Sequence, residues 1–230
     1  MQGNDTVIAL CKKIALLIDE QTDTREERIR FEPRKNPLPG SLWKSAAPRD
    51  RAKRIDLVRS IATKLREGNT SFVVFHIDGD RPWAEAKDSE NVAKFQLFRE
   101  EIRRLLPPGG DHELRRLLLF APFYSIEAWL YQHVDRARAL CEQYHRGEHL
   151  VAIEAWRGAR GGLDELWKPK ERHCLRGDHN LALAGPGFPA REILAVDKSF
   201  AATVRRWQLV GEFAAALALT SAVPSVVGNK

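Results

Sequence analysis

The sequence predicts an α/β protein with a mostly parallel sheet flanked by helices and a helical C-terminal extension. Two short apolar runs, at 72–77 and 117–120, alternate with segments whose apolar residues recur at helical spacing. Strands that alternate with helices in this way are typical of a parallel, doubly wound sheet. We therefore expect an α/β domain over residues 1–145, with a loop-rich and helical extension over 146–230 packed on it.

The composition is that of an ordinary globular protein. Of the 230 residues, 43% are hydrophobic and 30% are charged, which excludes a largely disordered chain. The formal net charge of +6 permits a polyanionic partner but does not require one. The most apolar stretch, 209–227, is interrupted by Gly211, Glu212 and Pro224, so we expect no membrane span.

The cysteines and the N-terminus indicate a cytoplasmic protein. Cys11, Cys141 and Cys174 lie far apart and form no CxxC pair, so we expect core cysteines without a disulfide framework or a zinc site. The polar start of the chain, followed by Lys12 and Lys13, does not resemble a signal peptide. Both observations favour a reducing compartment.

The first elements are a helix, a short strand and a long loop. Apolar residues recur at helical spacing over 7–18, and Asp5 or Thr6 is the expected N-cap. This helix lies so close to the start of the chain that no strand is expected before it. Apolar and polar residues alternate over 29–31, which predicts a short strand. The stretch 34–48 contains three prolines and is typical of an irregular loop.

The middle of the chain supplies a basic helix and the two main strands. Residues 49–67 form a helix with a buried stripe that includes Ile55, while its outer face is rich in lysine and arginine. The run 72–77 suits a strand buried on both faces, with His76 as a core residue. A helix over 89–106 and a second buried strand over 117–120 complete a strand–helix–strand unit.

The remainder is predicted to be mostly helical. A helix capped by Ser125 is expected to run through Tyr144, and a short helix follows over 149–157. Residues 158–187 are rich in loop formers, and residues 190–220 are mostly helical.

The strongest chemical signal is the Asp78-Gly79-Asp80 sequence at the end of a buried strand. Ligands of open α/β sheets bind at the carboxyl ends of the strands. Two carboxylates two residues apart can converge on one cation where the chain turns, and Gly79 permits such a turn. Mg²⁺ is bound by a few carboxylates, waters and substrate phosphate. The alternative is a plain strand-to-loop junction, in which Asp and Gly form the turn.

The second signal is Glu127, two residues after Ser125, in the segment that follows the second strand. An acidic residue in the first turn of a helix is common, because it interacts well with the helix dipole. The functional interpretation is that Glu127 lies beside Asp78 and Asp80, because adjacent parallel strands end at the same edge. Three acids there would form a hard-cation site suited to phosphodiester hydrolysis.

These motifs together resemble the TOPRIM domain. The resemblance rests on the strand that ends in Asp78 and Asp80, on the YSIEAWL segment at 124–130, and more faintly on Gly3 and Asp5 before a helix. The YSIEAWL segment is similar to a helix start found in the OLD-type and RloB-like branch, which comprises bacterial defence nucleases often encoded beside an ABC-type ATPase. The similarity covers about residues 1–135.

The resemblance implies a Rossmann-like sheet, Mg²⁺ or Mn²⁺, and an anti-phage nuclease that cleaves DNA or RNA. Asp78, Asp80 and Glu127 would be the catalytic and metal-binding residues. The sequence departs from the family at Gln2, where the family has a glutamate at the end of its first strand. Asp5 is a candidate to replace that carboxylate.

Basic and aromatic residues in expected loops are candidates for contacts with nucleic acid. Their alternative interpretation is ordinary solvated loop charge. The candidates for phosphate contact are Arg81, Lys168, Lys170, Arg172 and Arg176, together with His173 and His179. The tryptophans divide into three in loops that could stack on bases, Trp43, Trp83 and Trp167, and three expected in the core, Trp129, Trp156 and Trp207.

Two other functions remain open from the sequence. The first is a catalytically impaired TOPRIM-like regulatory or binding subunit that partners an ATPase, which would account for Gln2. The second is phosphotransfer or phosphate-ester hydrolysis on a small substrate, although no Gly-rich phosphate loop followed by lysine is found. A homo-oligomer is compatible with each of these functions.

Overall fold

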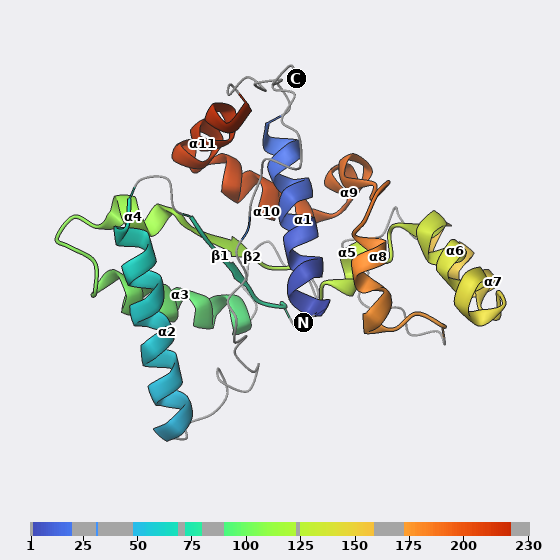
Figure 1. Cartoon of the computed structure of the whole chain (residues 1–230), viewed down its shortest axis with the longest axis horizontal. Helices are drawn as coiled ribbons and strands as arrows, with labels where there is room; N and C mark the ends of the chain where they lie inside the picture. The colour runs from blue at the N-terminus through green and yellow to red at the C-terminus, as the bar shows by residue number, and fades with distance from the viewer. Residues whose placement is uncertain are drawn as a thin grey trace, which may run out of the picture.

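The computed structural model describes residues 2–19, 31, 48–68, 72–79, 90–122, 125–158 and 173–221. Within these residues the protein is a mixed α/β molecule, mostly helical, with one two-stranded parallel sheet. Figure 1 shows the sheet near the centre, with helices on both sides of it. The predicted α/β class is therefore confirmed, and the described part of the sheet is small.

The sheet is a strand–helix–strand unit. β1 (Val73–His76) pairs in parallel with β2 (Leu117–Phe120), and the paired residues run from Val73 opposite Leu117 to His76 opposite Phe120. The connection contains α3 (Glu90–Arg103) and α4 (Asp111–Arg115). Parallel neighbours require such a crossover. Both predicted strands and the helix between them are confirmed, whereas the one-turn helix α4 was not predicted.

The remaining helices lie before and after this unit. α1 (Gln2–Ile18) and α2 (Pro48–Arg66) precede it. The helices that follow are α5 (Glu127–Leu130), α6 (Val134–His145), α7 (Leu150–Gly158), α8 (Asn180–Leu183), α9 (Ala190–Val196), α10 (Lys198–Gln208) and α11 (Gly211–Ser221), with a 3₁₀ turn at Gly177–His179 before α8. The structure confirms the predicted helices over 7–18, 49–67 and 149–157 and the mostly helical stretch over 190–220.

Alternate residues of the strands pack into two separate hydrophobic cores. Successive side chains of a strand point to opposite faces of the sheet. Leu117 and Leu119 pack into the smaller core, formed with α2, α3 and α4. Leu118 and Phe120 pack into the larger core, which joins α1 to the helices that follow β2. The sheet therefore separates two layers of helices, as the continuous apolar strands predict.

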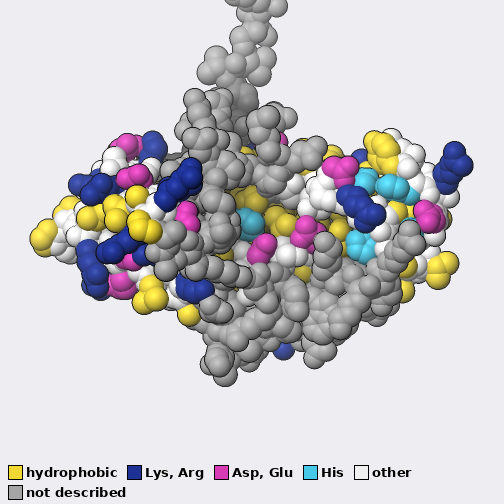
Figure 2. Space-filling view, turned by 90° about the horizontal axis from the view of Figure 1, so that it is seen from below, with side chains coloured by type: hydrophobic (Ala, Val, Ile, Leu, Met, Phe, Trp, Pro, Cys, Tyr) yellow, Lys and Arg dark blue, Asp and Glu magenta, His cyan; other side chains and the backbone are white. Residues whose placement is uncertain are grey.

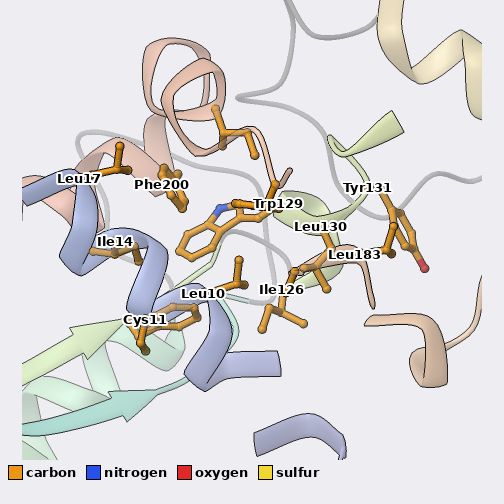
Figure 3. Packing of buried hydrophobic residues seen from close by; sticks show 14 of the residues in the cluster. Leu10, Cys11, Ile14, Leu17, Ile126, Trp129, Leu130, Tyr131, Leu183 and Phe200 are labelled. Carbon is orange, nitrogen blue, oxygen red and sulfur yellow. The ribbon is translucent and has the colours of Figure 1, made fainter. Parts of the chain in front are cut away.

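The larger core surrounds the indole ring of Trp129. Figure 3 shows this ring between the side chains of α1, α5, α8 and α10. Trp129 makes edge-to-face contacts with Phe120 and Phe200, with ring centroids 5.0 Å apart in each pair. Its Nε1 donates a hydrogen bond to the Ser199 hydroxyl at 2.8 Å. The three tryptophans expected in the core, Trp129, Trp156 and Trp207, are all buried.

A buried arginine ties β2 to the end of α2. Arg116 directly precedes β2, and its guanidinium group donates hydrogen bonds to the carbonyl oxygens of Leu65 and Gly68. Leu65 lies in the last turn of α2, where the carbonyl groups have no partner within the helix, and Gly68 follows the helix by two residues. Nothing in the sequence pattern predicts this contact.

The start of the chain differs from the prediction. α1 begins at Gln2, so Asp5 and Thr6 lie within the helix and do not cap it. The expected turn around Gly3 is also helical. Phe31, predicted at the end of a short strand, lies outside any strand and packs against the larger core. Ile29, Arg30 and residues 34–47 of the predicted loop lie outside the described residues, and Pro48, the last residue of that loop, instead begins α2.

The predicted helix over 125–144 is two helices separated by a turn. α5 ends at Leu130, and α6 begins at Val134. The backbone N–H groups of Gln132 and His133 bond to carbonyls three residues earlier, which tightens the chain after Leu130. The side chains of Gln132 and His133 are buried and bond to Asp197 and to the Leu183 carbonyl oxygen. Tertiary hydrogen bonds therefore override the local helical pattern.

Three predictions about burial are wrong. His76 is exposed, and β1 is only half-buried, whereas both were expected in the core. Within the described residues, β2 is the single strand beside β1, so the edge of β1 that faces away from β2 has no neighbouring strand there. Ile55, expected in the buried stripe of α2, is 39% exposed, and Leu57 is buried in its place.

Two of the three cysteines are joined, contrary to the expectation of free core thiols. A disulfide connects Cys141 of α6 to Cys174, and their Cα atoms lie 6.2 Å apart. Both residues belong to the larger core, which brings together segments 33 positions apart in the sequence. Cys11 is buried with a free thiol, as expected. Among the helices described, none is both long and apolar enough to cross a membrane.

Asp197 is a buried carboxylate that caps α10. Its Oδ1 accepts hydrogen bonds from the Phe200 amide at 2.8 Å and from the Ser199 hydroxyl at 2.7 Å. Its Oδ2 accepts one from Gln132 Nε2 at 3.0 Å. Burial raises the pKa of the Asp197 carboxyl above its ordinary value of 3.8, against the opposing effect of these hydrogen bonds.

This raised pKa makes stability depend on pH. The folded state holds the Asp197 proton more tightly than the unfolded chain, so the free energy of unfolding falls as pH rises from about 4 through the folded-state pKa. Asp197→Asn cannot titrate, and we expect it to remove this part of the slope. Urea unfolding of the wild type, Asp197→Asn and the exposed control Asp56→Asn between pH 4 and 7 measures the effect. If the free energy of unfolding of the wild type instead rises with pH relative to that of Asp197→Asn, the pKa of Asp197 is lowered in the folded state. That result would contradict the prediction.

Candidate functional site

The carboxyl edge of the sheet extends beyond the two strands. The Ile77 amide donates to the Phe120 carbonyl oxygen at 3.0 Å, and the Gly79 amide donates to the Pro122 carbonyl oxygen at 2.9 Å. The parallel ladder therefore continues on both sides of Asp78. This arrangement holds the backbone of Asp78 beside the segment that leads from β2 towards α5.

Asp78 is paired with a histidine on the same strand edge. Its carboxylate is partly exposed, and its Oδ1 lies 3.3 Å from Nε2 of His76. Side chains two residues apart in an extended chain lie on the same face, which explains the contact. The His76 ring also packs edge-to-face on Phe120, with ring centroids 5.3 Å apart. His76 is thus an orienting partner of Asp78 that the sequence analysis assigned to the core.

Glu127 is held by hydrogen bonds to both of its carboxylate oxygens. It is the first residue of α5 and is half-buried. The Ser125 hydroxyl donates to Oε2 at 2.6 Å, and the Asn180 amide donates from Nδ2 to Oε1 at 3.1 Å. The predicted capping role of Ser125 is wrong, because its hydroxyl bonds to the Glu127 carboxylate and the N-cap position of α5 is Ile126. The carboxylate is therefore fixed in orientation.

Glu127 and Arg176 both influence the Tyr131 hydroxyl. Burial raises the pKa of the Tyr131 hydroxyl far above its ordinary value, the negative charge of Glu127 raises it further, and Arg176 opposes both. Tyr131 is therefore a neutral hydrogen-bonding group at physiological pH. Arg176 is exposed, as its predicted role in phosphate contact requires.

Asn180 brings the segment after Cys174 to Glu127. The residue is 8% exposed and begins α8, which packs against α1 and α5. Its Oδ1 is buried and accepts no hydrogen bond from the residues that the structure describes. Asn180 was not predicted as a site residue, since no local pattern separates it from an ordinary residue at the start of a helix.

His179 has a structural role in the turn before α8. The Arg176 amide donates to Nδ1 of His179 at 3.0 Å. This nitrogen carries the lone pair, so the proton of the neutral ring lies on Nε2. Asp178 Oδ1 also lies 3.3 Å from Nδ1, but an accepting nitrogen cannot donate to it. The ring packs edge-to-face on His145, with centroids 5.4 Å apart.

The other predicted site residues are scattered or lie outside the described residues. His173 is buried between the rings of Tyr131 and Trp156, with centroids 5.2 and 5.3 Å away. Asp5 is exposed near the start of α1, close to the end marked N in Figure 1. The candidates that lie outside the described residues are Asp80, Arg81, Lys168, Lys170 and Arg172, and so are Trp43, Trp83 and Trp167.

Charges are unevenly distributed over the face seen from below. Figure 2 shows acidic side chains near the middle of this face, while Lys and Arg side chains gather mainly at the end formed by α2 and α3. Arg49 and Arg51 of α2 are exposed, whereas Lys64 of the same helix pairs with Glu67 at 2.6 Å.

Comparisons with known proteins leave the chain without an assigned relative. No protein-family model, no curated protein and no solved structure matches it. Within the described ranges, no group of three or more His, Cys, Asp and Glu side chains is arranged to hold a metal, and Asp80 lies outside those ranges. The candidate site thus consists of Asp78 with His76, and of Glu127 with Ser125 and Asn180.

Proposed function

We propose that this protein is a cytoplasmic, metal-dependent nuclease that hydrolyses nucleic-acid phosphodiesters, with a Rossmann-like TOPRIM domain around its parallel strands. The proposal rests on one observation. Asp78 lies two residues after β1, where the Gly79–Pro122 hydrogen bond continues the parallel ladder, and Glu127 lies after β2 at the start of α5. Carboxylates that follow adjacent parallel strands suit a ligand at the carboxyl edge of an α/β sheet. Anti-phage defence is the biological role we propose.

The donor groups suit a hard divalent cation. Asp78 and Glu127 offer carboxylate oxygens from two different elements, and Asp80 adds a third in the sequence. Mg²⁺ and Mn²⁺ favour such oxygen ligands. When bound, a divalent cation stabilises negative charge on a phosphodiester and makes water a stronger nucleophile. Ser125 fixes the orientation of Glu127, and His76 orients Asp78.

The basic surface supports a polyanionic substrate. Exposed arginines of α2, among them Arg49 and Arg51, would contact phosphates along the backbone of a nucleic acid. Arg176, close enough to Tyr131 to influence its pKa, would contact a phosphate nearer to Glu127. Arg81, Lys168, Lys170 and Arg172 remain candidates for the same role.

A cleavage assay tests the proposal. Purified full-length protein is incubated with single- and double-stranded DNA and RNA, each with Mg²⁺, Mn²⁺ or EDTA. We expect at least one nucleic acid to be cleaved, and this cleavage should require the cation. Cleavage should also fall as the salt concentration is raised, because binding to phosphates releases counterions and is therefore weaker at high salt. Absence of cleavage under every condition, with and without an ABC-type ATPase encoded beside the gene, would contradict the nuclease proposal.

The alternative is a regulatory or binding subunit that partners an ATPase. It is favoured by Gln2, which stands where the TOPRIM pattern has a glutamate and lies within α1. This alternative predicts binding of nucleic acid or of the ATPase, without cleavage, in the same experiment. Hydrolysis of a nucleotide or phosphate ester, with DNA and RNA left intact, would indicate the small-substrate alternative. Size-exclusion chromatography with light scattering tests the proposed homo-oligomer.

A further inference from the structure

Asn180 is rigidly placed beside Glu127. The residue begins α8, which also carries Leu183 into the larger core beside Leu130 of α5 (Figure 3). Only 8% of Asn180 is exposed, and its Nδ2 lies 3.1 Å from Glu127 Oε1. Packing between α1, α5 and α8 therefore holds the Asn180 amide group against the carboxylate.

One hydrogen bond sets the present orientation of the Asn180 amide group. Its Nδ2 donates to Glu127, while the buried Oδ1 accepts no hydrogen bond from the described residues. Buried polar atoms without a partner are uncommon, and a bound ion or water is a frequent reason for them. Among the residues that the structure describes, no hydrogen bond to Oδ1 opposes a half-turn of the amide group. A half-turn exchanges the positions of oxygen and nitrogen, which have nearly the same size.

The half-turn would bring two oxygen ligands to the right spacing for a cation. An oxygen in the present position of Nδ2 would lie 3.1 Å from Glu127 Oε1. Neighbouring ligands of an octahedral Mg²⁺ lie about 3.0 Å apart when each metal–oxygen distance is about 2.1 Å. The spacing fits without movement of the backbone. The second oxygen of Glu127 keeps its hydrogen bond from Ser125.

We propose that Asn180 is a further ligand of the divalent cation bound by Glu127, and that its amide group turns to present Oδ1 when the cation binds. This inference rests on the proposed metal-dependent function. It assigns the C-terminal extension, residues 146–230, a direct part in the site, because α8 lies in this extension and would supply a ligand beside Glu127 of α5. Without the cation, the Nδ2 hydrogen bond holds the carboxylate in place.

Direct measurement of Mn²⁺ binding tests this role without relying on cleavage. The full-length protein is titrated with Mn²⁺ alone, and free Mn²⁺ is followed by electron paramagnetic resonance. We expect Asn180→Ala to weaken Mn²⁺ binding about tenfold or more. Glu127→Gln should weaken it at least as much, and the exposed control Gln96→Ala should bind as the wild type does. Circular dichroism checks that each variant is folded.

Asn180→Asp separates a ligand from a residue that only positions Glu127. Aspartate supplies an oxygen ligand but cannot donate a hydrogen bond to the Glu127 carboxylate. A ligand role therefore predicts that Asn180→Asp binds Mn²⁺ at least as tightly as the wild type, whereas a positioning role predicts weakening like that of Asn180→Ala.

The outcomes distinguish this inference from the proposed function. If Glu127→Gln weakens Mn²⁺ binding but Asn180→Ala binds Mn²⁺ as tightly as the wild type, the role of Asn180 is overturned. The proposed metal site at Glu127 would then still stand. Equal weakening in Asn180→Ala and Asn180→Asp also overturns the ligand role. Wild-type Mn²⁺ affinity in Glu127→Gln overturns both the inference and the proposed metal site.

Discussion

Glu127→Gln should lower cation-dependent cleavage by about a hundredfold to a thousandfold, as the loss of a major electrostatic contribution at a catalytic site does. The change removes one negative charge while keeping the size of the side chain. Cleavage rates are measured with Mg²⁺ and with Mn²⁺ on the nucleic acid that the wild type cleaves. Because the lost group binds the cation, raising the concentration of either metal should restore only part of the activity.

The fold should tolerate this substitution. A glutamine at position 127 can accept the Asn180 hydrogen bond through its oxygen and donate to the Ser125 hydroxyl through its nitrogen, so both present contacts have a replacement. The matched control is Glu142→Gln, an exposed glutamate on α6. Asp78→Asn should behave like Glu127→Gln. Wild-type cleavage rates in both Glu127→Gln and Asp78→Asn would remove these residues from the mechanism.

The sequence was most informative where local pattern and tertiary packing agree. The runs at 72–77 and 117–120 lack polar alternation, and they form parallel strands whose alternate residues enter two cores. The helices over 7–18 and 49–67 also follow the spacing of their apolar residues. Apart from the half-buried strand β1 and the exposed Ile55, the residues that favour the local structure in these segments are also those that tertiary packing buries.

Prediction failed where contacts between distant segments decide the local structure. The turn after Leu130 is held by Gln132 and His133, which bond to residues 65 and 50 positions later, respectively. The contact between Glu127 and Asn180 spans 53 positions, and the bridge between Cys141 and Cys174 spans 33. The periodicity of apolar residues does not indicate which distant residues will be in contact.

The candidate site illustrates the same division. Asp78 and Glu127 were found because each follows a recognisable strand. Their partners His76 and Asn180 were missed, because His76 looks like a core residue in an apolar run and Asn180 looks like an ordinary helix start. A carboxylate at a predicted sheet edge needs a hydrogen-bond donor. The sequence alone does not indicate which of many distant residues provides that donor.

The largest effect on stability is expected at Trp129, two residues after Glu127. Trp129→Ala removes a fully buried indole ring between Phe120 and Phe200 and leaves the Ser199 hydroxyl without its donor. Truncation of a buried tryptophan costs about 3–5 kcal/mol. For a chain of this size, that cost corresponds to a fall in Tm of roughly 6–20 °C.

Guanidinium unfolding and calorimetry measure this loss against a matched surface truncation. Leu209→Ala removes an apolar side chain that is 80% exposed, and it should change the free energy of unfolding by less than about 0.5 kcal/mol. Trp129→Phe keeps most of the ring contacts but loses the hydrogen bond to Ser199, so its stability should lie between those of the wild type and Trp129→Ala. Because this core joins α1, α5, α8 and α10, its loosening should also free Glu127 from Asn180 and weaken Mn²⁺ binding. A Trp129→Ala variant as stable as Leu209→Ala would show that this core does not hold the two halves of the site together.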